Sequence, residues 1–353
     1  MGDSAAVVLG SAVATAFGTS VRTNCDALLA TRTAFREPSH FDAKGRVLGI
    51  DPELDPGRGS RFFRLLAKLR DAADFAIPAG TRLFLASTVG AVDLLESGGT
   101  EETVAAALRE AERLFGLPDA ILVSAACASG QSAISLAMKQ LAAGKCRRAL
   151  VIGADIAGEF VTAGFASLGA LSASVCRPYD LHRDGLTLGE AAAALLLGTE
   201  EDDGPGRILR CAENCDAAHI TAPDLEGKTL RRAIEQATDG VPVAGIIGHG
   251  TGTVYNDQAE VAALRALFPA GMPPLFSLKG NFGHTLGATG VLQCALGLEF
   301  AVRGILPPQA GLRQPMEGAN AAATMRELDT PTRFLSLNVG FGGLNSAVVL
   351  EAS

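Results

Sequence analysis

Short runs of apolar residues alternate along the chain with longer stretches that are rich in alanine and leucine. Apolar runs bounded by Gly, Pro or charged residues predict buried β-strands, and apolar residues at a helical spacing predict α-helices. Strands are expected over residues 6–9, 83–86, 120–125, 149–152, 191–197, 245–247, 274–278, 334–337 and 346–350. Helices are expected over residues 21–30, 61–75, 103–115, 129–143, 258–267 and 285–302. This alternation is typical of an α/β fold.

The pattern stops at one segment and then begins again. Residues 200–206, Glu-Glu-Asp-Asp-Gly-Pro-Gly, are acidic and rich in residues that break regular structure, so they predict a linker. On each side of it, a strand runs into a turn of small residues that carries a reactive side chain, Cys127 or His284, and a long alanine-rich helix follows. We therefore expect a pseudo-duplicated architecture, with halves over residues 1–200 and 207–353 and a site where they meet.

The composition is that of a globular protein. With 353 residues, of which 48% are hydrophobic and 19% charged, the chain can bury a large core. Its net charge of -8 argues against general nucleic-acid binding, which requires a basic face. The apolar runs are too short or interrupted for a membrane span, and residues 1–9 lack the features of a secretory signal. Seven cysteines without disulfide-like or zinc-like spacing predict free thiols, which fit a cytoplasmic protein without a metal.

Cys127 lies in Ala-Ala-Cys-Ala-Ser-Gly, in the turn between a predicted strand and a predicted helix. The unpaired N–H groups and the dipole of a helix N-terminus favour a thiolate, the form of cysteine that acts as a nucleophile. The backbone N–H of Cys127 could also stabilise a developing oxyanion. The alternative is a buried thiol that acts only as a small hydrophobic side chain, which is the usual role of cysteine.

His249 lies in Gly-His-Gly-Thr-Gly-Thr, which is a turn and not an apolar helix face. The flanking glycines indicate a close approach between the backbone and a ligand. Thr251 and Thr253 alternate, so their hydroxyls are expected on one side of a groove, where they would suit a polar, uncharged chain such as a pantetheine arm. Turn formation without a ligand explains the same residues equally well.

His284 follows Lys279 by five residues, with glycines between them. A neighbouring cation disfavours imidazolium, and a neutral imidazole can donate one N–H to an enolate oxygen. Two such donors directed at one point would form an oxyanion site. Asp257 and Glu260 follow His249 by eight and eleven residues. These carboxylates could neutralise Lys279 or orient a histidine; a helix cap and a surface charge are the alternative.

Five motifs, in their order and approximate spacing, resemble the β-ketoacyl synthase family of the thiolase superfamily. They are the Ala-Cys-Ala-Ser-Gly turn at Cys127, residues 177–180 with 183–185 and 189–190, the turn at His249 with Asp257 and Glu260, residues 279–287, and residues 340–343 with Asn345. The resemblance extends over nearly the whole chain. It implies a thiolase-like, pseudo-duplicated, five-layered αβαβα fold.

The resemblance also implies a decarboxylative Claisen condensation in fatty acid, polyketide or polyene synthesis. Cys127 would accept an acyl group from an acyl carrier protein, and a malonyl thioester would then bind with its carbonyl between His249 and His284. Loss of carbon dioxide would leave an enolate that attacks the acyl group on Cys127. The backbone N–H groups of Cys127 and Phe341 would hold the oxyanion, and Phe341 would be a gate to the acyl pocket.

The same resemblance implies supporting roles for four further residues. Lys279 would support His284, with Glu260 as its charge partner. Thr251 and Thr253 would contact the phosphopantetheine arm. No metal or diffusible cofactor is expected, because the carrier protein brings the substrates on its own phosphopantetheine.

An acidic carrier protein requires a basic docking surface. Arg58, Arg61, Arg64 and Lys68 are the best candidates, because the last three share one helical face and because the family has such a surface near here. A solvated helix face is the alternative. The family also implies a dimer paired through the strand before Cys127, formed with a second copy or with another ketosynthase-like subunit.

Several positions depart from the family pattern. The segment from Gly90 to Cys127 is short, Val339 and Leu344 replace an aromatic residue and a threonine near the Gly-Phe-Gly-Gly turn, and the usual threonine before the nucleophile is absent. Three interpretations remain: an active condensing enzyme, a chain-length-factor-like subunit that does not condense, and a non-decarboxylating thiolase. Retention of the cysteine, both histidines and the lysine favours the first.

Overall fold

The computed structural model describes residues 5–55, 59–100, 102–217, 219–328 and 332–353. Within these ranges, one continuous sheet of ten strands spans the molecule. From one edge to the other, its strands are β10 (Leu275–Phe276), β9 (Gly245–Ile247), β13 (Arg333–Gly340), β14 (Leu344–Ala352), β8 (Gly206–Cys215), β1 (Ala6–Ala14), β7 (Ala191–Gly198), β6 (Ala149–Asp155), β4 (Arg82–Ala86) and β5 (Ile121–Val123). Two small sheets pair β2 (Phe35–Arg36) with β3 (Leu48–Gly49), and β11 (Ile305–Leu306) with β12 (Arg326–Glu327).

The large sheet contains one five-strand arrangement twice. The order β1-β7-β6-β4-β5 is repeated as β8-β14-β13-β9-β10, with the strands taken up by the chain in the same succession. The pair directions agree as well, since β1–β7 and β8–β14 are antiparallel, and β4–β6 and β9–β13 are parallel. The two arrangements join where β1 pairs antiparallel with β8. The strand order is therefore pseudo-duplicated, whereas the exact domain limits at residues 200 and 207 stay a prediction.

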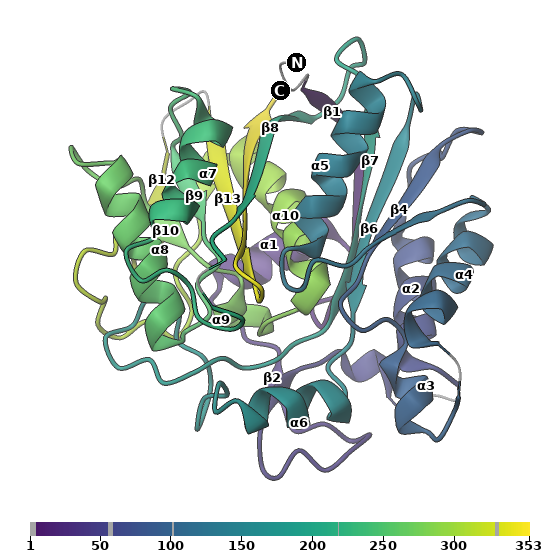
Figure 1. Ribbon diagram of the computed structural model, residues 1–353, viewed down its shortest axis with the longest axis horizontal. Helices are drawn as coiled ribbons and strands as arrows, with labels where there is room; N and C mark the ends of the chain where they lie inside the picture. The colour runs from purple at the N-terminus through teal and green to yellow at the C-terminus, as the bar shows by residue number, and fades with distance from the viewer. Residues whose placement is uncertain (1–4, 56–58, 101, 218, 329–331) are drawn as a thin grey trace.

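Helices on both sides of each half of the sheet give the five layers of a thiolase-like fold (Figure 1). The central layer contains α5 (Ser129–Ala142) and α10 (Thr289–Arg303), which contact strands of both halves. α10 is buried on nearly all sides, as expected of a helix enclosed between the two halves of the sheet. The outer layers are formed by α2 (Arg61–Ala72) and α4 (Thr103–Phe115) on the first half, and α7 (Lys228–Thr238) and α8 (Val254–Leu267) on the second.

Short helices connect these layers and approach the site. α1 (Val21–Leu29) packs against α10. α6 (Glu159–Ser167) follows β6, and α9 (Lys279–Phe282) follows β10 and precedes a short 3-10 turn over Leu286–Ala288. α3 (Val92–Glu96) lies between β4 and α4. The connections after β6 and β10 therefore bring parts of the two halves to the same region.

Most of the predicted elements are present, and the differences have physical reasons. α4 and β9 have the predicted ends. The helix predicted from residue 285 begins at Thr289, because the 3-10 turn takes up the residues before it. The strand predicted as buried over residues 120–125 is the shorter β5, which is half-buried because it lies at the edge of the sheet. The sequence pattern does not predict β8, because Arg210 and Glu213 interrupt its apolar residues.

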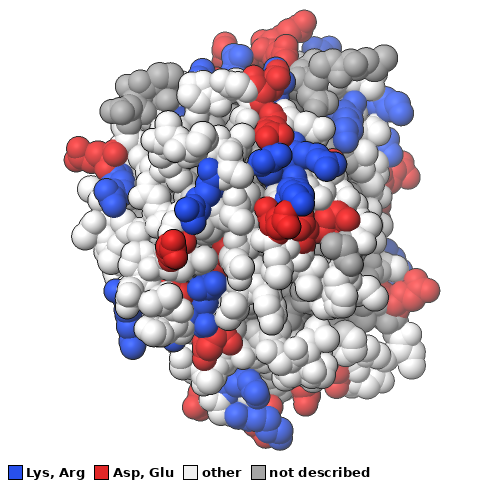
Figure 2. All heavy atoms as spheres, turned by 60° about the vertical axis from the view of Figure 1, so that its left-hand side comes forward, with Lys and Arg blue, Asp and Glu red and all other residues white. Residues whose placement is uncertain are grey.

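The surface carries both signs of charge. On the face that Figure 2 shows, basic side chains occur in small groups next to acidic ones, and uncharged surface separates these groups. This distribution agrees with the moderate net charge of -8. None of the helices in the described ranges has the length and hydrophobicity needed to cross a bilayer.

Candidate active site

The three candidate catalytic side chains line one cavity of about 390 Å³. Cys127 lies between β5 and α5, His249 follows β9, and His284 lies between α9 and the 3-10 turn. β5 and β10 are equivalent strands of the duplicated sheet, and the chain after them leads into α5 and α10, the two helices of the central layer that contact each other. The same cavity is lined by further predicted residues, which are Thr251, Thr253 and Phe341. The structure thus brings these residues together, and their catalytic roles stay predictions.

His284 is directed at the sulfur of Cys127. Its Nε2 atom lies 3.0 Å from Cys127 Sγ, and its Nδ1 atom accepts the backbone N–H of Leu286 at 3.2 Å. A neutral imidazole that accepts at Nδ1 carries its proton on Nε2. Burial, assisted by the charge of Lys279, lowers the pKa of His284 well below its ordinary value of 6.5. His284 therefore presents a neutral N–H donor to the reacting centre.

His249 lines the same cavity, with its ring beside that of His284. The ring centroids of His249 and His284 are 5.5 Å apart, and the rings are nearly perpendicular at 87°. The ammonium of Lys279 lies 3.3 Å from Nδ1 of His249 and also donates to the His249 carbonyl oxygen. This contact places the proton of a neutral His249 on Nε2. Burial, followed by the charges of Lys279 and His284, lowers the pKa of His249 well below 6.5.

The contacts of Lys279 and Glu260 differ from the predicted ones. Lys279 hydrogen-bonds to His249 and not to His284, on which it acts only through its charge. Glu260 accepts the backbone N–H groups of His249 at 2.6 Å and Gly250 at 2.8 Å, so its carboxylate holds the turn and acts on Lys279 as the predicted charge partner without a direct contact. Burial lowers the pKa of Lys279 to about 8, and the negative charge of Glu260 opposes this shift.

Burial has the largest effect on the pKa of the Cys127 thiol and raises it to about 11. The charge of Lys279 and the backbone N–H groups of Phe341 and Cys127 act in the opposite direction. The expected thiolate is therefore not the resting form of this cavity, because desolvation outweighs the helix N-terminus. The two N–H groups nevertheless lie beside the sulfur, where the predicted oxyanion hole for the acyl group requires them.

Polar and aromatic residues line the approach to the sulfur. The hydroxyls of Thr251 and Thr253 lie 2.9 Å apart on the cavity wall, so they can bind a polar chain together. The ring of Phe341 is 36% exposed and lies 5.6 Å from the ring of Phe165, which comes from α6. Sequence patterns do not identify Phe165, because one aromatic residue in a short helix carries no signal. Within the described ranges, no group of three His, Cys, Asp or Glu side chains could hold a metal ion.

Asp155 is a buried carboxylate beside the site that the sequence analysis does not identify. It ends β6 and accepts the Ser87 hydroxyl at 2.6 Å and the Gly287 N–H at 2.7 Å. Both oxygens also accept from Thr88. Asp155 therefore ties the end of β4 to the turn that follows His284. An acidic residue at the end of an apolar strand is the only sequence signal for it.

The predicted carrier-docking surface is wrong for Arg61, which is only 4% exposed. Its guanidinium donates to Glu190 through Nε at 2.9 Å and through Nη2 at 2.5 Å, and it also contacts Asp55. Glu190 begins the segment that leads into β7, and it is fully enclosed by the fold. Arg61 therefore belongs to a buried ion pair and not to a basic surface.

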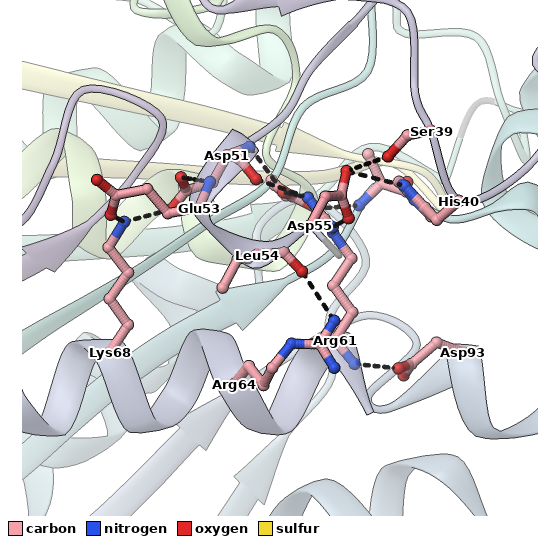
Figure 3. Close-up of polar contacts among 12 residues, drawn as sticks. Ser39, His40, Asp51, Glu53, Leu54, Asp55, Arg61, Arg64, Lys68 and Asp93 are labelled. Carbon is pink, nitrogen blue, oxygen red and sulfur yellow. Dashed lines mark hydrogen bonds and ion pairs between the residues drawn. The ribbon is translucent and has the colours of Figure 1, made fainter. Parts of the chain in front are cut away.

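Arg64 and Lys68, two further predicted docking residues, also have partners within the chain (Figure 3). Lys68 binds Asp51 at 2.6 Å and Glu53 at 2.5 Å, so two carboxylates surround its charge. The guanidinium of Arg64 donates to backbone carbonyls, including that of Leu54 at 2.9 Å. Arg58 lies outside the described residues. Arg64 and Lys68 hold residues 51–54, and an acidic partner would have to displace carboxylates to reach Lys68.

Replacing Arg61 with methionine is expected to destabilise the fold by about 3–5 kcal/mol, because it leaves the carboxylate of Glu190 buried without its partner. Chemical denaturation measures this change as a lower midpoint. Lys145 is exposed and serves as the control, since Lys145→Met should change stability by less than about 0.5 kcal/mol. Equal stability of the two variants would contradict a structural role for Arg61.

Comparisons with known proteins agree with this fold. Residues 115–203 match the family model of the β-ketoacyl synthase N-terminal domain, and residues 206–313 match that of the C-terminal domain. A putative polyketide β-ketoacyl synthase 1 of Streptomyces cyaneus is 29% identical, over 97% of this chain and 97% of the relative.

Solved structures give the same result. A β-ketoacyl synthase from Burkholderia phymatum STM815 superposes with a TM-score of 0.85 and 26% identity, over 99% of this chain and 100% of that one. The ishigamide ketosynthase/chain length factor superposes with a TM-score of 0.83 and 25% identity, over 99% of this chain and 100% of that one. The similarity therefore extends over the whole fold and includes the segments that carry the cavity.

Proposed function

Because the chain belongs to the β-ketoacyl synthase family, we propose that it is a condensing acyltransferase that extends an acyl thioester with a malonyl-derived unit. One observation carries this proposal. Cys127 Sγ lies 3.0 Å from His284 Nε2, and the ring of His249 lies 5.5 Å from that of His284, so a nucleophile and two neutral imidazoles line one cavity. This set suits thioester exchange followed by formation of an enolate.

The first half-reaction is acyl transfer to Cys127. The sulfur attacks the thioester carbonyl of an acyl carrier protein, a new carbon–sulfur bond forms, and the bond to the carrier thiol breaks. The thiol proton passes to the departing carrier thiolate. The backbone N–H groups of Cys127 and Phe341, which lie beside the sulfur, hold the transient oxyanion. The high pKa of the free thiol makes this proton transfer part of the step.

The second half-reaction is decarboxylation and carbon–carbon bond formation. The thioester oxygen of a malonyl carrier accepts hydrogen bonds from the Nε2–H groups of His249 and His284. Loss of carbon dioxide leaves the bonding electrons in an enolate, which attacks the acyl carbonyl on Cys127. The new carbon–carbon bond forms, the acyl–sulfur bond breaks, and the released thiolate takes a proton from solvent. The product is a β-ketoacyl carrier protein.

The proposed partners follow from this chemistry. The phosphopantetheine arm of the carrier protein would pass Thr251 and Thr253, whose hydroxyls line the cavity. The arm is part of the substrate, so no further cofactor is included. The site would work in a dimer, formed either by two copies of this chain or with another ketosynthase-like subunit. We also propose a cytoplasmic location.

The direct test incubates the purified chain with acyl and malonyl carrier proteins and follows the intact masses. The expected result is an acyl adduct on Cys127, followed by a carrier product extended by two carbons. The incubation is repeated with a co-expressed ketosynthase-like partner. Absence of both the adduct and the product under both conditions would contradict the condensing function.

A chain-length-factor-like subunit is the second candidate. The similarity to the ishigamide ketosynthase/chain length factor supports it, because that structure combines both kinds of subunit. In this interpretation the chain would shape a partner's pocket without condensing. An intact cavity with Cys127, His249 and His284 favours the enzyme, and the mass experiment separates the two. A non-decarboxylating thiolase is less well supported, because the C-terminal turn carries Phe341 where a second catalytic cysteine would be expected.

The rate of malonyl decarboxylation should fall as the pH rises through about 8. Lys279 has its pKa lowered to about 8, so above this pH it loses the proton that it shares with Nδ1 of His249. His249 then loses its fixed tautomer and donates less effectively. Release of carbon dioxide, measured between pH 6 and 9.5, should show this basic limb, and Lys279→Met should lose it. A wild-type rate that still rises at pH 9 would contradict this role of Lys279.

A further inference from the structure

Tyr179 is a fully buried residue that lies in the connection between α6 and β7. Its backbone has a φ of 60°, which is unfavourable for a bulky side chain. Strained backbones of this kind persist only where the surroundings fix them, and they are frequent at functional sites. The connection belongs to the first half of the chain, whereas the contacts of Tyr179 lie in the second.

Three hydrogen bonds fix Tyr179 in this conformation. Its backbone N–H donates to Asp257 Oδ2 at 2.9 Å, and its carbonyl accepts the N–H of Met316 at 2.8 Å. Its phenolic hydroxyl donates to Glu260 Oε2 at 3.0 Å. Burial raises the pKa of Tyr179 well above 10, so the hydroxyl keeps the proton that it donates. Asp257 and Glu260 are the two carboxylates that also hold the His249 turn.

The aromatic ring of Tyr179 lies directly against the His249 turn. A Cβ atom at Gly248 would lie 2.0 Å from the Tyr179 hydroxyl oxygen, and one at Gly250 would lie 2.5 Å from the same group. Neither position can therefore carry a side chain while the ring is in place. The glycines on both sides of His249 make room for this tyrosine, which corrects the prediction that they allow a ligand to approach the backbone.

Glu260 connects the tyrosine to the histidine. Its Oε1 atom accepts the N–H of His249 at 2.6 Å, and its Oε2 atom accepts both the N–H of Gly250 at 2.8 Å and the Tyr179 hydroxyl. The carboxylate is buried, so its orientation depends on these three donors. Without the Tyr179 hydroxyl, the carboxylate keeps only its two bonds to the turn itself, so nothing outside the turn fixes its Oε2 atom and the His249 backbone is held less firmly.

We propose that Tyr179 is a positioning residue for decarboxylation. Through Glu260, it holds His249 in the position from which the imidazole donates to the enolate. This inference rests on the proposed function, and it assigns Tyr179 to one half-reaction only. Its hydroxyl is linked to the His249 turn, whereas Cys127 and its oxyanion hole lie in the turn between β5 and α5 and in the Phe341 turn. Loss of the hydroxyl should therefore weaken enolate stabilisation and leave acyl transfer to Cys127 intact.

The variant Tyr179→Phe keeps the ring that the glycines enclose and removes only the hydroxyl. Loss of a hydrogen bond to a charged group should lower the rate constant for malonyl decarboxylation by about tenfold, with little change in KM. Acylation of Cys127, followed by intact mass, should remain within about twofold of wild type. Equal losses in both half-reactions, or wild-type decarboxylation, would overturn the assignment.

A double-mutant cycle tests whether Glu260 transmits the effect. Glu260→Gln should itself slow decarboxylation, and adding Tyr179→Phe to it should cause less than the tenfold loss seen in the wild-type background. Full additivity of the two effects would show that the hydroxyl acts by another route and would overturn the proposal.

The same four proteins separate this inference from the proposed function. If the wild-type protein performs neither half-reaction, that result contradicts the condensing function but does not test the link between Tyr179 and Glu260. The link between Tyr179 and Glu260 is then measured by the free energies of unfolding of the four proteins. Non-additive unfolding energies support the link, and additive ones overturn it.

Discussion

Replacing Cys127 with alanine should abolish acyl transfer. No other thiol is expected to take over, because Cys127 is the cysteine that lines the cavity with both histidines. Loss of the nucleophile removes the covalent intermediate, so condensation should fall by at least about 10⁴-fold. The measurement is the intact mass of the protein after incubation with an acyl carrier protein, together with the yield of extended product.

A buried cysteine elsewhere provides the control. Cys146 follows α5 and does not line the cavity, so Cys146→Ala should keep wild-type acylation. Decarboxylation of malonyl carrier should continue in Cys127→Ala, because both N–H donors remain in place. An acyl adduct on Cys127→Ala that matches the wild-type amount would show that the nucleophile lies elsewhere.

Replacing His249 with alanine should lower the rate of malonyl decarboxylation by about 10²–10³-fold, the usual effect of removing one oxyanion-hole donor. Acylation of Cys127 should change much less, because His284 is the imidazole next to the sulfur, with Nε2 and Sγ 3.0 Å apart. The release of carbon dioxide and the mass of the acyl-enzyme measure the two half-reactions separately.

His182 is the matched control for this variant. Its side chain is exposed in the connection between α6 and β7, so His182→Ala should keep both half-reactions at wild-type rates. Acylation that falls as far as decarboxylation in His249→Ala would contradict the division of labour between the two histidines.

Local patterns predict the fold well where a strand or helix carries a clear signal. The ends of α4 and β9 follow from periodicity, and the duplicated strand order agrees with the repeated pattern on either side of residues 200–206. β8 is not predicted because Arg210 and Glu213 interrupt its apolar residues, and its pairing with β1 and β14 is what makes it a strand. Pairing between distant strands decides such cases, and no local window contains it.

The sequence predicts the reacting groups of the candidate site better than the groups that support them. Cys127 and both histidines lie in turns with distinctive sequences, and the three side chains line one cavity. Spacing along the chain cannot show that Lys279 contacts His249 instead of His284, because the choice depends on how two loops cross. For the same reason the sequence suggests that Arg61 is a surface cation, although it forms a buried ion pair with Glu190, which is distant in the chain.

The most direct test of the proposed function is a single turnover of the isolated chain. Protein that has been acylated on Cys127 is mixed with malonyl carrier protein, and the mass of the carrier-bound product is measured. The proposed mechanism predicts that the adduct on Cys127 disappears as a β-ketoacyl carrier, longer than the acyl group by two carbons, is formed. An adduct that persists, or that is lost by hydrolysis without an extended product, would contradict the mechanism.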